Sequence, residues 1–171
     1  GPDGLPNLFL KTCAHGFAVP LCHVFDISLK THKLPKEWKK ANILPIHKKG
    51  PNSLPANYRP ISITSSCCRA MEKIINNGIL SYLHLHGLVS RHQHGFLHSK
   101  STCTNLLECV YDWSVALQSR LRTDIIYFDF RKAFDSVSHI KLIQKLEAYG
   151  IGGNLLAWII DFLSDRTQHV Q

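Results

Sequence analysis

The stretch Tyr127–Asp135, YFDFRKAFD, follows the apolar pair Ile125-Ile126 and places a carboxylate, Asp129, among aromatic side chains. Because β-strands are rich in aromatic and β-branched residues, residues 123–130 are predicted to form a strand. A buried carboxylate without a partner is costly, or its pKa changes until the group is neutral. Asp129 therefore needs a partner, a metal ion or a place at a crevice where it stays ionised.

Alternation along this strand divides its side chains between two faces. One face, which is expected to pack on helices, consists of Ile126, Phe128 and Phe130. The other face carries Asp129 at the end of the strand, beside a crevice. Because Mg²⁺ binds one or two carboxylates and takes its other ligands from water and phosphates, Asp129 is a candidate magnesium ligand. The alternative is that Asp129 caps the turn after the strand.

A second metal-binding carboxylate is not evident nearby. Two-metal catalysis needs ligands that converge on ions about 4 Å apart. Asp124 lies roughly 17 Å from Asp129 along an extended strand, and Asp135 comes close only if the chain turns after Arg131. The second carboxylate of such a site is therefore expected beyond Gln171.

The composition is typical of one folded domain, with 171 residues of which 44% are hydrophobic and 19% charged. No apolar run is long enough to span a membrane, and no segment resembles a secretory leader. The sequence therefore predicts an intracellular protein of the nucleus, the cytoplasm or both, which is neither secreted nor membrane-bound.

The net charge is +8, and the basic residues concentrate between Lys30 and Arg59, where Glu37 is the single acid. Such a field favours a polyanionic partner, either nucleic acid or an anionic membrane. The alternative is a solvated basic face without a partner.

Histidines gather at residues 84–86 and 92–98. No cysteine lies near them at the spacing of a zinc finger, so surface or loop histidines are predicted rather than a structural zinc site. The six cysteines form no C-x-x-C pair, which indicates reduced thiols.

Strands and helices are predicted without regular βαβ alternation, which favours the α+β class. Apolar runs at 41–46 and 61–64 flank a polar loop and predict a hairpin or loose ribbon with a positive tip. Gly87 is expected to end the second predicted helix and Ser101 or Thr102 to begin the third. Helices are expected at about 21–33, 71–83, 102–117, 139–149 and 154–163, and a further strand within 166–171.

Five segments occur in a characteristic order: GPDGLP, WKKANILPIHKKG, NYRPIS, QHGF followed by ST, and YFDFRKAFDSV. Together they resemble the N-terminal half of a reverse transcriptase, with the nearest likeness to the non-LTR, LINE-like retrotransposon branch. The resemblance covers nearly the whole chain. It implies a fragment of a right-hand polymerase, with mostly helical fingers and a basic ribbon in residues 1–120. Residues 121–171 are then the start of the palm, with the first strand of its sheet and the following helices.

The implied activity is that of an RNA-directed DNA polymerase, which adds deoxynucleotides to a primer 3′ end and uses two Mg²⁺ ions. The resemblance implies that Asp129 holds these ions, with the backbone carbonyl of Phe130 beside it. Phe134 falls at the position of the steric gate that rejects a 2′-hydroxyl, because a rigid ring leaves no room for the extra oxygen. The alternative for Phe134 is an ordinary core aromatic.

Lys48 and Arg59 match the bases that grip the incoming deoxynucleoside triphosphate, and the adjacent Lys49 is an alternative to Lys48. A further segment is implied to contact template and primer, the alternative being a turn with a buried phenylalanine. Its residues are Gln93, Gly95 and Phe96.

The family's second catalytic turn with paired aspartates and its Gly-Pro-Gln-Gly segment do not occur in these residues. The fragment alone is therefore expected to be inactive without the C-terminal palm and thumb of the same polypeptide. Its expected partners are an RNA template, a DNA primer or target DNA, and deoxynucleoside triphosphates.

One alternative is a degenerate or domesticated relic that binds RNA without catalysis. A haloacid dehalogenase-type phosphatase is disfavoured, because that family has aspartate at the position of Arg131.

Overall fold

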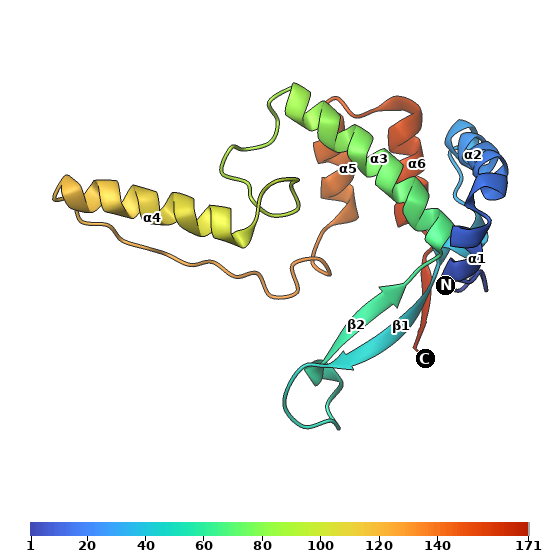
Figure 1. Cartoon of the computed structure of the whole chain (residues 1–171), viewed down its shortest axis with the longest axis horizontal. Helices are drawn as coiled ribbons and strands as arrows, with labels where there is room; N and C mark the ends of the chain where they lie inside the picture. The colour runs from blue at the N-terminus through green and yellow to red at the C-terminus, as the bar shows by residue number, and fades with distance from the viewer. Residues whose placement is uncertain (171) are drawn as a thin grey trace. The chain divides into compact units, whose positions relative to one another are not determined.

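The computed structural model describes residues 1–170. It shows helices together with a small sheet of three strands in the order β2-β1-β3 (Figure 1), so the mixed α and β class is confirmed. The chain divides into two compact units: unit 1 is Gly1–Leu80 with Ser138–Gln171, and unit 2 is Ser81–Val137. The predicted division at residue 120 concerns functional subdomains and remains a prediction.

Most predicted helices are confirmed within a few residues. The helix predicted at about 21–33 ends at Thr31 instead, because His32 adopts a left-handed conformation with φ of 55°. None of the helices within residues 1–170 is long and apolar enough to cross a membrane. The helices are α1 (Asn7–Thr12), α2 (Ala14–Thr31), α3 (Ser66–Leu85), α4 (Thr102–Gln118), α5 (His139–Ala148) and α6 (Gly153–Leu163), with short 3-10 turns at Lys36–Lys39 and Pro55–Asn57.

The predicted hairpin is confirmed. Strand β1 (Lys40–His47) pairs antiparallel with β2 (Tyr58–Ile63), in a register from Asn42 opposite Ile63 to His47 opposite Tyr58. This ribbon extends away from α3, with the loop of residues 48–57 at its far end (Figure 1). Strand β3 (Thr167–Val170) pairs parallel with the start of β1, and the part of the predicted last strand at residue 171 lies outside the described residues.

The apolar core lies in unit 1, where α2, α3, α6 and β1 meet. Trp158 of α6 is 2% exposed, and its indole N–H donates to Ser28 Oγ of α2 over 2.9 Å. The hydroxyl of Ser28 in turn donates to the carbonyl of Lys33 over 2.7 Å, so no polar group of this pair lacks a partner. The buried hydrophobic residues are Phe25, Leu34, Trp38, Ala41, Ile43, Cys67, Cys68, Met71, Ile151, Leu156, Trp158 and Ile159.

An ionic contact joins α6 to the segment after α2. The carboxylate of Asp161 accepts from the Leu34 amide over 2.8 Å and from the ammonium groups of Lys33 and Lys39 over 3.0 Å each. Burial alone raises the pKa of Asp161, but the Leu34 amide and the two lysines outweigh it and lower the pKa to about 2.

This shift predicts a pH-dependent contribution to stability. Because the pKa of Asp161 is lower in the folded state, its stabilisation is complete above about pH 4 and disappears as the pH falls toward 2. Asp161→Asn should lower the free energy of unfolding by about 2 kcal/mol at pH 6 and by much less at pH 2. Urea unfolding followed by circular dichroism between pH 2 and 6 measures the difference. Asp165→Asn, at an exposed neighbouring carboxylate, is the control, and an Asp161→Asn difference that is constant with pH would contradict the assignment.

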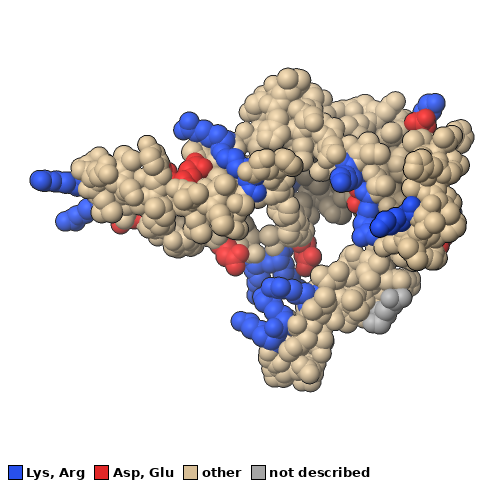
Figure 2. Space-filling model, in the orientation of Figure 1, with Lys and Arg blue, Asp and Glu red and all other residues tan. Residues whose placement is uncertain are grey.

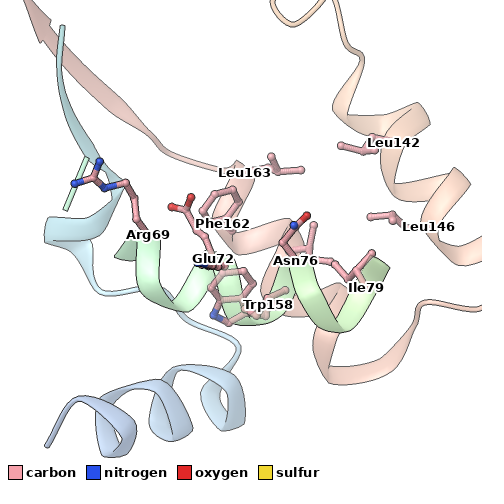
Figure 3. Close-up of a pocket in the computed structure, with 12 residues that line it drawn as sticks. Arg69, Glu72, Asn76, Ile79, Leu142, Leu146, Trp158, Phe162 and Leu163 are labelled. Carbon is pink, nitrogen blue, oxygen red and sulfur yellow. The ribbon is translucent and has the colours of Figure 1, made fainter. Parts of the chain in front are cut away.

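An apolar groove of about 620 Å³ lies between α3, α5 and α6 (Figure 3). Ile79 of α3 and Leu142 and Leu146 of α5 line one part of it, whereas Trp158 and Phe162 of α6 line another. None of the predicted site residues lines this groove. The groove shows that the three helices leave part of their apolar surface uncovered.

Unit 2 consists mainly of α4 and the loops on either side of it. Ser101 begins α4 with a capping box, in which Thr104 N–H donates to Ser101 Oγ and Ser101 N–H donates to Thr104 Oγ1. This confirms Ser101 as the predicted cap. Gly87, with φ of 63°, follows the end of α3 as predicted.

The predicted strand at residues 123–130 is wrong. These residues run without strand hydrogen bonds, because no other segment within residues 1–170 lies beside them to complete a ladder. The face that was expected to pack on helices is open instead, with Phe128 85% and Phe130 78% exposed. The strand-like sequence is present, but the described residues supply neither its partner strand nor its packing surface.

Candidate functional site

The residues singled out in the sequence are divided between the two units. Unit 1 carries Lys48, Lys49 and Arg59 on the ribbon. Unit 2 carries the loop with Gln93, Gly95 and Phe96 and the segment with Asp129, Phe130 and Phe134. Each unit therefore presents its own part of the candidate site.

The ribbon tip is held by hydrogen bonds within its loop. Asn57 Nδ2 donates to the Pro51 carbonyl over 2.8 Å, and Tyr58 Oη donates to the Asn52 carbonyl over 3.0 Å. Gly50 has φ of 84°, and a Cβ at this position would come within 2.7 Å of the Asn57 side chain. The loop thus needs glycine here, and its bonds give the bases beside it a defined backbone.

The pairing register places Lys48 and Arg59 on the same face of the ribbon. Lys48 N–H donates to the Asn57 carbonyl over 2.8 Å, so Lys48 continues the register opposite Asn57, while Arg59 lies opposite Ile46. Because side chains alternate along paired strands, Lys48 and Arg59 are diagonal neighbours, whereas Lys49 lies in the bend beyond the paired residues. This geometry favours Lys48 over Lys49 as the companion of Arg59. The side chains of Lys48 and Arg59 are both exposed.

Basic side chains exceed acidic ones on the face of the molecule shown in Figure 2, in line with the net charge of +8. Three lysines near the start of the ribbon are partly neutralised, since Lys33 and Lys39 pair with Asp161 and Lys40 pairs with Glu37. Within residues 1–170, the bases at the ribbon tip form no ion pair with a carboxylate. Their positive charge is therefore available to a phosphate.

Asp129 is exposed in the extended segment of unit 2. A single exposed carboxylate suits a hard cation such as Mg²⁺, provided that water, phosphates and a further carboxylate complete the coordination. No group of three or more histidine, cysteine, aspartate or glutamate side chains within residues 1–170 has the arrangement of a metal site. Asp129 thus fits one ligand position of a magnesium site and does not by itself form the site.

Two of the predicted residues are brought together in unit 2. The rings of Phe96 and Phe134 meet edge to face, with centroids 5.9 Å apart and an interplanar angle of 87°. Phe96 is 86% and Phe134 is 78% exposed. The alternatives of a buried Phe96 and a core Phe134 are therefore wrong, because unit 2 offers no apolar core to receive either ring.

A polar cluster beside this pair is not predicted by the sequence reasoning. His94 lies in a loop, as predicted for these histidines, but at 8% exposed it is the only buried residue of unit 2, Ser81–Val137. Its Nδ1 lies 2.8 Å from Thr104 Oγ1, and its Nε2 lies 2.8 Å from Glu108 Oε2. Glu108 also accepts from Nδ1 of His92.

The hydrogen bonds from His94 and His92 lower the pKa of Glu108 against the opposing effect of burial. A signal for this cluster was present in the sequence. Thr104 and Glu108 are four residues apart and so lie on one face of α4, facing the His-x-His segment before it.

Comparisons with known proteins show which family the chain resembles. Residues 46–171 match the family model described as reverse transcriptase (RNA-dependent DNA polymerase). The chain is 32% identical over 148 residues to a probable RNA-directed DNA polymerase from transposon X-element of Drosophila melanogaster, covering 86% of this chain. It is 29% identical over 171 residues, 99% of this chain, to the RNA-directed DNA polymerase from mobile element jockey of the same organism.

A third similar protein is the retrovirus-related Pol polyprotein from type-1 retrotransposable element R2 of Popillia japonica, 29% identical over 138 residues, 81% of this chain. The chain spans only 16% of the length of the X-element protein and 19% of the lengths of the jockey and R2 proteins.

Proposed function

This chain belongs to the reverse transcriptase (RNA-dependent DNA polymerase) family, and we propose that it supplies the first part of the polymerase of a non-LTR retrotransposon. The polymerase adds deoxynucleotides to a DNA primer or target DNA along an RNA template. The match over residues 46–171 carries the proposal, because it includes the ribbon tip, strand β2 and the Asp129 segment. The predicted resemblance to non-LTR retrotransposon polymerases is confirmed by the transposon relatives.

In this proposal residues 1–120 serve as fingers and residues 121–171 as the start of the palm. Further polypeptide of the longer protein covers the exposed apolar segment before Phe134. Two observations support this: Ile126 is 73% and Phe128 is 85% exposed, and the relatives are several times longer than this chain. An apolar patch of this kind marks a surface for another part of a protein.

Arg59 and Lys48 bind the phosphates of the incoming deoxynucleoside triphosphate in this proposal. The planar guanidinium of Arg59 donates to two phosphate oxygens at once, whereas Lys48 adds a flexible point charge. Their common face on the ribbon lets one triphosphate contact both. Gln93, Gly95 and Phe96 belong to the surface that contacts template and primer.

Asp129 contributes one carboxylate to a magnesium site, with the backbone carbonyl of Phe130 as its neighbour. Bound magnesium neutralises phosphate charge and orients the reacting oxygens. The exposed carboxylate of Asp129 is a suitable hard ligand. The remaining carboxylate is expected from the same longer polypeptide.

The direct test is primer extension by the longest open reading frame that encodes this chain, with an RNA template, a DNA primer, deoxynucleotides and Mg²⁺. Extension that depends on template sequence supports the proposal. RNA binding without extension, with an affinity that falls steeply as salt rises, would instead favour a domesticated relic.

The shared face of Lys48 and Arg59 makes a specific kinetic prediction. Lys48→Ala and Arg59→Ala should each lower kcat/KM for deoxynucleotides by about 10- to 100-fold, because each removes a charge-assisted contact to phosphate. Lys49→Ala is the matched control, since it removes the same charge from the adjacent bend, outside the paired residues. Steady-state extension at varied deoxynucleotide concentration measures the three variants, and equal losses for Lys48→Ala and Lys49→Ala would refute the preference for Lys48.

The role of Phe134 makes a second prediction. With the ring removed in Phe134→Ala, the space for a 2′-hydroxyl opens, and the preference for deoxynucleotides over ribonucleotides should fall by about 100-fold. The readout is the ratio of kcat/KM for a deoxynucleotide and its matching ribonucleotide. Phe134→Tyr, which keeps a ring, should retain most of the preference. An unchanged ratio in Phe134→Ala would remove Phe134 from sugar discrimination.

A further inference from the structure

The ring of Phe134 contacts the ring of Phe96, a residue assigned so far only to the surface that contacts template and primer. The Phe96 ring lies edge to face against the Phe134 ring, at 5.9 Å between centroids and an interplanar angle of 87°. Aromatic pairs prefer this arrangement because the positive ring edge meets the negative ring face. Since Phe134 is 78% exposed, the packed core does not fix its ring, and the contact with Phe96 restricts its orientation.

The backbone of Phe96 is held in an uncommon conformation. Its φ is 62°, a left-handed value that bulky residues rarely adopt. The preceding turn is closed by Gln93 Nε2, which donates to the Gly95 carbonyl over 3.1 Å. A strained backbone persists where its surroundings determine it, and such positions concentrate at functional sites. The Phe96 ring is 86% exposed, so burial of the ring does not offset the cost of this backbone conformation.

The loop that carries Phe96 is fixed to α4 by the polar cluster around His94. The carboxylate of Glu108 only accepts hydrogen bonds, so Nε2 of His94 and Nδ1 of His92 both donate to it. Thr104, the other partner of His94, is itself held in the capping box at the start of α4. His94 is thus tied to the first and second turns of α4, two positions before Phe96.

We infer that Phe96 is a positioning residue for sugar selection, which orients the Phe134 ring through edge-to-face contact while His94 and Glu108 hold the loop that carries it. The inference rests on the proposed role of Phe134 as the residue that excludes the 2′-hydroxyl. It adds that discrimination depends on a second ring and on a polar contact with α4. Removal of either support lets the Phe134 ring turn away from the sugar.

Kinetics on the longest reading frame tests this dependence. Phe96→Ala should lower the deoxynucleotide preference by about three- to tenfold, the factor that corresponds to one lost aromatic pair, while Phe96→Tyr restores it. Because both residues act through one ring, the double variant Phe96→Ala/Phe134→Ala should match Phe134→Ala alone. Tyr111→Ala on α4, which also removes an exposed aromatic ring, should leave the preference unchanged.

Two outcomes separate the inference from the proposed function. If Phe134→Ala lowers the preference and Phe96→Ala does not, the positioning role is overturned and the role of Phe134 stands. If neither variant changes the preference, the role of Phe134 in sugar selection is overturned together with the inference. Additive losses in the double variant would also overturn the inference, because they would show that Phe96 acts apart from Phe134.

A measurement on the 171-residue chain tests the geometry without catalysis. With phenylalanine ring protons labelled and assigned through Phe96→Tyr and Phe134→Tyr, a nuclear Overhauser effect should connect the two rings. Glu108→Gln should weaken it, because an amide offers one acceptor oxygen to the two histidines instead of two. Asp112→Asn, one turn further along α4, is the matched control. Absence of the effect in the wild-type chain, or its persistence in Glu108→Gln, would contradict the proposed support.

Discussion

Replacing Asp129 with alanine abolishes primer extension, with an expected loss of at least about 1,000-fold in kcat. The physical reason is that, in the proposed role, the carboxylate supplies negative charge and oxygen ligands to a metal that stabilises the transferring phosphate. Alanine supplies neither, and water does not carry the missing charge. Since Asp129 is exposed and packs in no core, the loss should appear in extension without loss of folding. Primer extension with Mg²⁺ by the longest reading frame, beside circular dichroism of the purified protein, measures both.

Asp124 offers a matched control for this prediction. It is an exposed carboxylate of the same extended segment, so Asp124→Ala changes net charge equally but removes no proposed metal ligand. Asp129→Glu keeps the charge and moves it by one methylene, and it should retain partial activity. Equal activity of Asp129→Ala and Asp124→Ala would reject the assignment of Asp129 as a metal ligand. Binding to template RNA should be retained in both variants, since contacts of lysine and arginine side chains with the RNA phosphates determine the affinity.

Replacing Trp158 with alanine is expected to cause the largest loss of stability, about 3–5 kcal/mol in the free energy of unfolding. The indole is 2% exposed and stacks on Phe162 with ring centroids 5.3 Å apart. It also donates to Ser28 and so joins α6 to α2. Because Trp158 lines the groove between α3, α5 and α6, solvent reaches part of the space it leaves, and the loss should lie near the lower value. Urea unfolding followed by circular dichroism at 222 nm measures it.

Two further variants separate packing from hydrogen bonding at this position. Trp158→Phe keeps a ring beside Phe162 but loses the N–H donor, so it should cost about 1–2 kcal/mol. Trp113→Ala, at a partly exposed tryptophan of α4 in unit 2, should cost markedly less than Trp158→Ala. If the two alanine variants unfold at the same urea concentration, the contact between α6 and α2 is not a main source of stability.

Local structure was predictable where the signal lies within a few residues. Ser101 was expected to begin α4, and the capping box with Thr104 is present, because such a cap needs only neighbouring backbone groups. The hairpin of β1 and β2 was predictable for a similar reason: two apolar runs flank a loop rich in Gly, Pro and Asn. The position of Gly87 after α3 follows the same rule.

The segment at 123–130 shows where such reasoning stops. Its composition is that of a strand, yet a strand exists only when a second segment supplies hydrogen bonds, and no sequence window contains that partner. His94 lies in a loop, as predicted, but its burial was not foreseen. A histidine in a polar loop is expected at the surface, but Thr104 and Glu108 bury it by satisfying both of its ring nitrogens.

The sequence by itself determined most of the helices, the ribbon, the family and the choice of Asp129, Arg59 and Phe134 as candidate site residues, because these depend on local order and spacing. The tertiary structure decided that Lys48 shares a face with Arg59, since strand register fixes which side chains are neighbours. It also decided that Phe96 meets Phe134. That contact joins segments far apart in the chain, and the loop that carries Phe96 is hydrogen-bonded to α4 through His94.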